Sequence, residues 1–174
     1  SHTHLIMAGM YQTYPNLSAA RSEEEAVQMM KAAADQDEQE DGRGESNSKG
    51  WLIGFSWYHV FWDNKTLPSR HSLDRYFPDR PVFLLNAEAH GAWVNTKALE
   101  IAGITRDTPD PFGGEIMRDE QGDATGFLYE SATGLVTKFA LAFSPEQEKK
   151  LIRAYLDGAK KYGITSVNDV IYLW

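Results

Sequence analysis

Two histidines near the start of the chain, His2 and His4, are separated by a single residue. Side chains alternate between the two sides of an extended segment, so both imidazoles lie on the same side. Two neutral imidazoles aimed at one point are a common beginning of a divalent metal site. A catalytic zinc site usually has three protein ligands and an open position, so the pair predicts half of such a site. The alternative interpretation is a terminal tail without function.

The composition is that of a soluble globular domain with an acidic surface. The chain has 174 residues, of which 42% are hydrophobic, and its net charge is −8. Nucleic-acid binding needs clustered Lys and Arg, which this balance disfavours, and no run approaches the ~18 apolar residues of a membrane span. The absence of cysteine excludes disulfides and thiolate chemistry. We expect no nucleic-acid or membrane partner and, by default, a cytoplasmic location.

The first half of the chain predicts a helix, a polar loop and two strands. Ser22 has the capping-box spacing for a helix that continues to residue 34, and residues 35–50 are polar enough to predict a mobile loop. Strands are expected in the first half of 51–62 and at 81–85, the second of them buried on both faces. A short helix between them, at 69–77, predicts a parallel crossover.

The sequence of residues 95–140 predicts two helices, one before and one after a β-hairpin. Asn95 can cap a helix that Gly103 ends in the left-handed conformation. Gly122 lies in the expected turn of the hairpin. The elements expected here are a helix at 95–101, strands at 115–118 and 125–129, and a helix at 131–140.

The two ends of the chain fit successive strands of a (β/α)₈ barrel. Ser144 begins a strongly capped helix, and the β-branched run 164–167 after it predicts a strand that ends at Asn168 and Asp169. The expected fold class is therefore α/β: a partial (β/α)₈-barrel fragment dominated by an inserted α/β domain with a small sheet, a β-hairpin and flanking helices. The expected domains are 1–16 (end of barrel strand 1 and loop), 17–143 (insertion) and 144–174 (barrel helix and strand 2).

Two polar residues, His90 and Glu130, stand at the ends of expected strands, where side chains can reach a ligand. His90 either hydrogen-bonds a substrate or packs with its ring satisfied by backbone groups, and both interpretations stay open. A carboxylate at Glu130 is explained by the dipole of the helix that follows, and a substrate contact is the alternative.

Six aromatic residues gather around the same strand ends. The simpler interpretation places them in the core of the insertion. The alternative is that Trp57 and Trp93, which neighbour strand ends, wall an apolar substrate pocket. The six are Phe55, Trp57, Tyr58, Phe61, Trp62 and Trp93.

Several motifs follow one another in a recognisable order along the chain, at residues 1–5, 8–9, 78–85, 89–95, 97–99, 113–116, 126–130 and 163–167. Together they resemble one branch of the amidohydrolase superfamily, amidohydrolase family 3, which includes N-substituted formamide deformylases. The resemblance covers nearly the whole chain apart from 35–50.

This resemblance implies a metal-dependent hydrolase in which His2 and His4 help to hold one or two divalent ions, with zinc expected. It also implies that the other ligands and the catalytic aspartate lie beyond Trp174, so no catalytic residue is expected in this segment. Asp169 either supports the metal site or caps a loop. Asn168 stands where many relatives have a histidine, which departs from the pattern of the family.

The function expected of the parent protein is hydrolysis of a small amide- or formamide-type substrate at a C–N bond outside a peptide. The isolated chain is expected to be inactive and to hold no metal tightly, because half the ligands are missing. The alternative is a stand-alone binding module without catalysis that keeps the fold of the insertion. Because two barrel strands without neighbours expose apolar edges, the chain ends are expected to pair with each other, to be disordered or to form a homodimer.

Overall fold

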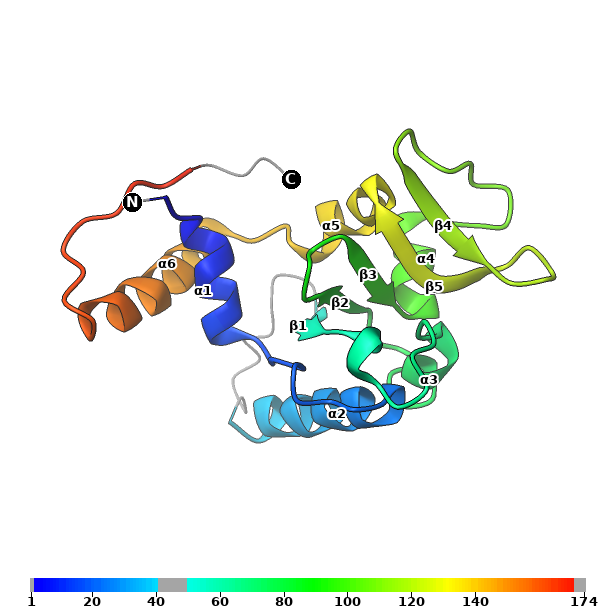
Figure 1. Cartoon of the computed structure of the whole chain (residues 1–174), viewed down its shortest axis with the longest axis horizontal. Helices are drawn as coiled ribbons and strands as arrows, with labels where there is room; N and C mark the ends of the chain where they lie inside the picture. Colours follow the sequence, from blue (N-terminus) through cyan, green and yellow to red (C-terminus); the bar gives the residue numbers. More distant parts are fainter. Residues whose placement is uncertain (1, 41–49, 171–174) are drawn as a thin grey trace. The chain divides into compact units, whose positions relative to one another are not determined.

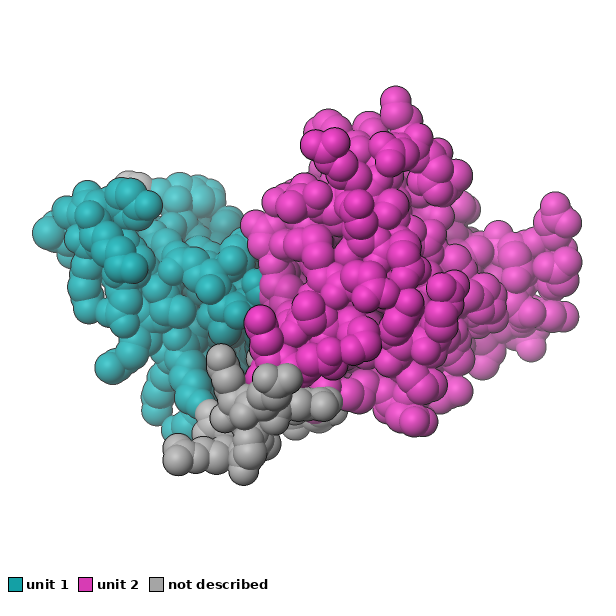
Figure 2. Space-filling view, turned by 90° about the horizontal axis from the view of Figure 1, so that it is seen from below, with its two compact units in different colours: residues 1–14, 143–174 teal, residues 15–142 magenta. Residues whose placement is uncertain are grey.

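The computed structural model describes residues 2–40 and 50–170, and the chain divides into two compact units. Unit 1 comprises residues 1–14 and 143–174, and unit 2 comprises residues 15–142 (Figure 2). Among the described residues, no helix is long and apolar enough to cross a membrane.

Unit 2 is built on a five-stranded mixed sheet with the order β1-β2-β3-β5-β4 (Figure 1). The first two strands are parallel, as the crossover predicted, and the other pairs are antiparallel. The sequence did not predict β3, whose four residues are all buried between β2 and β5. The strands are β1 (Leu52–Trp57), β2 (Val82–Asn86), β3 (Gly91–Val94), β4 (Gly114–Arg118) and β5 (Ala124–Glu130).

In the described part of unit 2, four α-helices and two short 3-10 helices accompany the sheet. They are α2 (Glu23–Glu40), η1 (His59–Phe61), α3 (Arg70–Asp74), α4 (Thr96–Ala102), η2 (Ser131–Thr133) and α5 (Gly134–Ala140). Helix α2 begins where Ser22 Oγ accepts the Glu25 N–H at 3.1 Å. The prediction of a loop that begins at residue 35 is wrong for residues 35–40. These Asp, Gln and Glu residues continue helix α2. The rest of that expectation, residues 41–49, lies outside the described residues.

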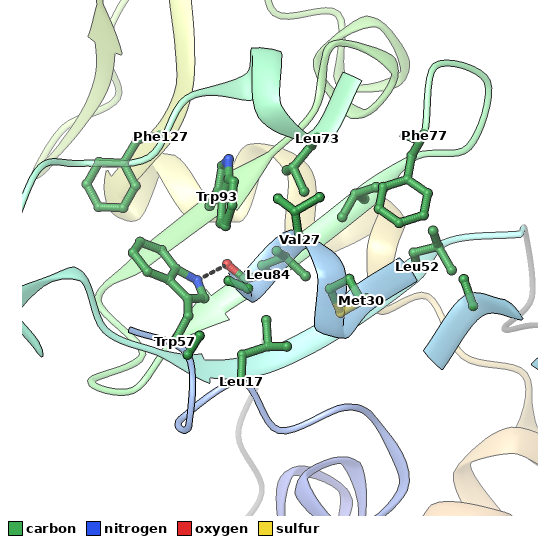
Figure 3. Close-up of a cluster of buried hydrophobic side chains, with 14 of the residues drawn as sticks. Leu17, Val27, Met30, Leu52, Trp57, Leu73, Phe77, Leu84, Trp93 and Phe127 are labelled. Atoms are coloured by element: carbon green, nitrogen blue, oxygen red, sulfur yellow. Dashed lines mark hydrogen bonds between the residues drawn. The ribbon is translucent and has the colours of Figure 1, made fainter. Parts of the chain in front are cut away.

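One face of the sheet packs on α2 and α3 and forms a cluster of buried hydrophobic side chains, called here the core cluster (Figure 3). Val27 and Met30 of α2 lie against Leu84 of β2 in this cluster. A β-bulge at Ser56, whose φ is 69°, shifts the register of β1 after Phe55. The extra residue lets Trp57 turn toward the same face, where its ring contacts those of Trp62, Trp93 and Phe127.

Asn95 joins three segments of unit 2 through one fully buried amide. Its Oδ1 accepts the N–H groups of Val82 and Ala98, so the residue both caps α4 and anchors β2. Its Nδ2 donates to the carbonyls of Phe77 and Arg80, each at 2.8 Å. The predicted cap is therefore confirmed, and Gly103 ends α4 at φ 69° as expected.

The outer edge of β4 is covered by side chains from its own neighbourhood. Asp110 Oδ1 accepts the Ile116 N–H at 3.0 Å, and Arg118 donates to the Ile116 carbonyl at 2.8 Å. The two charged groups also bind each other at 2.8 Å. These bonds satisfy backbone groups that an edge strand would otherwise present to solvent.

Unit 1 consists of α1 (Leu5–Thr13) and α6 (Pro145–Lys160), which pack against each other. The helices approach so closely at Gly9 that a Cβ atom there would lie 2.1 Å from the Leu151 carbonyl oxygen. The capping box predicted at Ser144 is present. Helix α1 was not predicted, and the predicted strand at 164–167 is wrong, because these residues have no partner strand in the described part of the chain.

Candidate functional site

The first and last described segments of unit 1 lie side by side. Thr3 donates its N–H to the Asn168 carbonyl at 3.0 Å and accepts the Val170 N–H at 2.7 Å, which makes a parallel bridge. Asp169 Oδ1 accepts the Leu5 N–H at the start of α1. The expected pairing of the chain ends is therefore present between Thr3 and residues 168–170, and Asp169 caps α1.

The pairing places the two histidines of the predicted metal site together. His2 Nε2 and His4 Nε2 are 3.3 Å apart. Two ligands bound to one zinc ion at 2.0–2.1 Å with tetrahedral angles lie about 3.3 Å from each other, so the two nitrogens are spaced for a shared ion.

The proton position on His4 also suits a metal ligand. His4 Nδ1 is 2.7 Å from the Val170 carbonyl oxygen. A carbonyl only accepts hydrogen bonds, so Nδ1 carries the proton and Nε2 of the neutral ring keeps its lone pair. Metal-binding histidines typically donate their second ring N–H in this way. The pair therefore fits a divalent ion, although within residues 2–40 and 50–170 no group of three or more His, Cys, Asp or Glu side chains could hold one.

Two of the predicted site residues of unit 2, His90 and Glu130, meet at one end of its sheet and form an ion pair. His90 Nδ1 is 3.0 Å from Glu130 Oε2, and the Glu130 N–H donates to the His90 carbonyl at 2.8 Å. The buried Asn86 Oδ1 accepts the N–H groups of His90 and Gly91, which fixes the turn between β2 and β3. The hydrogen bond to Glu130 and its charge raise the pKa of His90 above its ordinary value.

Three further residues, Tyr58, Glu88 and Tyr129, which the sequence analysis did not select as site residues, complete this end of the sheet. The Tyr58 hydroxyl donates to Glu88 Oε1 at 2.5 Å, which raises the pKa of Tyr58. The charge of Glu88 also raises the pKa of His90, and Tyr129 stands beside Glu130 at the end of β5. We call Tyr58, Glu88, His90, Tyr129 and Glu130 the strand-end cluster, because they stand at or just beyond the ends of β1, β2, β3 and β5.

The two tryptophans that were candidates for a pocket wall are both fully buried. Trp57 and Trp93 have 0% exposure and belong to the core cluster. Trp57 Nε1 donates to the Leu84 carbonyl, and Trp93 Nε1 donates to the Ser69 carbonyl (the first bond is dashed in Figure 3). The rings offer no surface to a ligand in this structure, so the pocket-wall interpretation is corrected in favour of the core interpretation.

Comparison with known proteins identifies the family. The model of the amidohydrolase family matches residues 1–173, so the chain belongs to this family. It is 36% identical over 165 residues to YtcJ of Bacillus subtilis, covering 95% of the chain and 30% of that protein. It is 31% identical over 125 residues to the N-substituted formamide deformylase of Arthrobacter pascens, covering 70% of the chain and 23% of that enzyme.

A solved structure has a similar backbone fold. An uncharacterized metal-dependent hydrolase from Pyrococcus horikoshii OT3 superposes with a TM-score of 0.66 at 26% sequence identity. The match covers 95% of this chain and 29% of that one. The chain thus spans less than a third of the length of these relatives.

Proposed function

We propose that this chain is part of a metal-dependent hydrolase that cleaves amide- or formamide-type C–N bonds outside peptides. The observation that carries the proposal is the 3.3 Å separation of His2 Nε2 and His4 Nε2, with the His4 ring oriented by the Val170 carbonyl. Membership of the amidohydrolase family supports hydrolysis. The similarity to an N-substituted formamide deformylase supports the type of bond.

In this proposal the two histidines hold a divalent ion, which we take to be zinc. Such an ion supplies a Lewis acid that polarises a carbonyl group and activates water. The hydrogen bond from His4 to Val170 keeps the ring in the orientation and tautomer that binding requires. His90 and Glu130 contact the substrate. Two ligands hold a metal weakly, so we expect the 174-residue chain by itself to show no turnover.

Metal binding tests the first part of the proposal on this chain. Calorimetric titration with zinc should give weak, saturable binding that His2→Ala and His4→Ala each abolish. His71→Ala, at an exposed histidine of α3, is the matched control and should leave zinc binding unchanged. Binding that survives both site substitutions would remove the histidine pair from the metal site.

Activity tests the second part on the protein encoded by the uninterrupted reading frame around this chain. With zinc bound, it should hydrolyse N-alkylformamides, and His4→Ala should lower kcat/KM at least about 100-fold. A reading frame that ends at both borders of this chain, together with no hydrolysis, would instead support the stand-alone binding module.

A further inference from the structure

We propose that the strand-end cluster binds an organic ammonium group, an amine cation carried on an apolar or aromatic substituent. The proposal concerns Tyr58, Glu88, His90, Tyr129 and Glu130 with the neighbouring Phe61. All of them belong to unit 2, so the site is complete within that unit.

The two carboxylates of the cluster differ in how much negative charge they retain. Glu130 faces His90 at 3.0 Å, so protonation of His90 offsets its charge. Glu88 is bound instead by the hydroxyl of Tyr58, and a phenol, whose ordinary pKa is about 10, carries no charge near neutral pH. A carboxylate accepts about four hydrogen bonds, and a single phenol leaves acceptor capacity for an N–H donor. Glu88 is therefore the anchor for a cation.

The anchor's phenol partner, Tyr58, belongs to a pair of aromatic rings that solvent can reach. The Tyr58 ring meets the ring of Phe61 edge to face, with centroids 5.1 Å apart. Phe61 is 74% exposed and Tyr129 is 42% exposed, so both rings present surface to solvent. Ring faces attract ammonium groups, and ring edges and apolar surface accept the substituent. A carboxylate bound to a tyrosine whose ring lies against an exposed phenylalanine matches a cation with an apolar group better than it matches an anion or a polyol.

The contribution of the His90–Glu130 ion pair to folding stability does not explain the strained backbone on either side of it. Ala89 and Glu130, which frame the ion pair, have φ values of 59° and 50°. Left-handed backbone at residues other than glycine is strained and persists only where the surrounding structure enforces it. The pair between His90 and Glu130 is exposed to solvent, so it contributes too little to folding to offset strain at two residues. The excess strain is consistent with selection for ligand binding.

The proposed ligand follows from the chemistry of the proposed function, and this link rests on that function. Hydrolysis of an amide adds water across the C–N bond: oxygen joins the carbonyl carbon, and nitrogen leaves as an amine after accepting a proton. An alkyl amine has a pKa near that of lysine, about 10.4, so it is released as an ammonium ion near neutral pH. The strand-end cluster then recognises the product amine of the reaction.

The test uses the 174-residue chain without metal, so its outcome does not depend on catalysis. The probes are 2-phenylethylammonium, the neutral 2-phenylethanol and the anionic 3-phenylpropionate, each titrated into labelled chain and followed by amide NMR shifts. We expect the ammonium probe alone to shift the amides of Glu88, His90 and Glu130, and to bind more weakly at high salt.

The matched variants are Glu88→Gln and Glu120→Gln, which remove one negative charge each. The amide side chain introduced by Glu88→Gln keeps an acceptor for Tyr58, so the fold is retained, and ammonium affinity should fall at least about fivefold. Glu120 is exposed in the hairpin turn between β4 and β5, and its substitution should leave affinity unchanged. Equal binding of the neutral or anionic probe, or unchanged affinity in Glu88→Gln, would overturn the proposal. If ammonium binding holds but the full-length protein shows no hydrolysis, the proposed function fails and the cation site stands.

Discussion

The two units differ in how many of their side chains are buried. Unit 2 has a sheet whose central strands are buried along their whole length and a large aromatic core. Unit 1 has two helices and a single bridge, and its buried residues within the described part are Gly9, Met10, Leu151 and Ala159. Burial of apolar surface is the main favourable term in folding, so unit 2 should be much the more stable. The proposed metal ligands thus belong to the weaker unit, and the strand-end cluster belongs to the stronger one.

The largest effect should come from the aromatic core of unit 2. Trp93→Ala removes a fully buried ring that contacts Trp57 and Trp62, and should lower the free energy of unfolding by about 3–5 kcal/mol in urea denaturation. Phe112→Ala, at a fully exposed side chain, should change it by less than about 0.5 kcal/mol. Equal effects of the two substitutions would show that unit 2 lacks the ordered core on which the comparison depends.

A smaller effect is expected where the helices of unit 1 touch. Gly9→Ala places a Cβ atom 2.1 Å from the Leu151 carbonyl oxygen and should cost about 1–3 kcal/mol. Amide hydrogen exchange should accelerate in α1 and α6 and stay unchanged in β2. The control is Gly134→Ala in α5, where no atom lies within 4 Å of the added Cβ. Faster exchange throughout β2 in Gly9→Ala would mean that the two units unfold together.

The smallest effect concerns the ion pair of the strand-end cluster. Glu130→Gln should lower the pKa of His90 toward its ordinary value in an NMR titration, because the hydrogen bond and charge that raise it are weakened. Since the folded-state pKa is the higher one, the pair stabilises the fold below the unfolded-state pKa of His90. This contribution is lost as the pH rises through the folded-state pKa.

Glu120→Gln is the control for this titration, because it removes one negative charge, as Glu130→Gln does. Its hairpin position is exposed, and the pKa of His90 should not move. An unchanged pKa of His90 in Glu130→Gln would show that the pair seen in the structure does not form in solution.

The sequence predicted most elements that have strong local signals. Asn95, Gly103 and Ser144 marked helix ends correctly because caps act through neighbouring backbone groups. The parallel pairing of β1 and β2 also followed from the chain order. Strand β3 was not predicted, because four residues are too few to show the alternation of apolar and polar side chains. Two of them, Gly91 and Ala92, also have low strand propensity.

The remaining errors arise where distant segments decide the local structure. Residues 164–167 are β-branched, but a strand forms only with a partner that supplies its hydrogen bonds. In the site, the types and spacing of His2 and His4 were sufficient to predict a pair of ligands. The contact between Tyr58 and Glu88 joins residues 30 positions apart, and neither carries a motif, so only the fold could reveal it.

The protected margin of β4 has a consequence for how the protein behaves at high concentration. Intermolecular strand addition requires free N–H and carbonyl groups along a flat border. At Ile116 both groups are already taken by Asp110 and Arg118. A second molecule would have to break these charged contacts before it could extend the sheet from that side, so this border resists the self-templated growth that leads to fibrils.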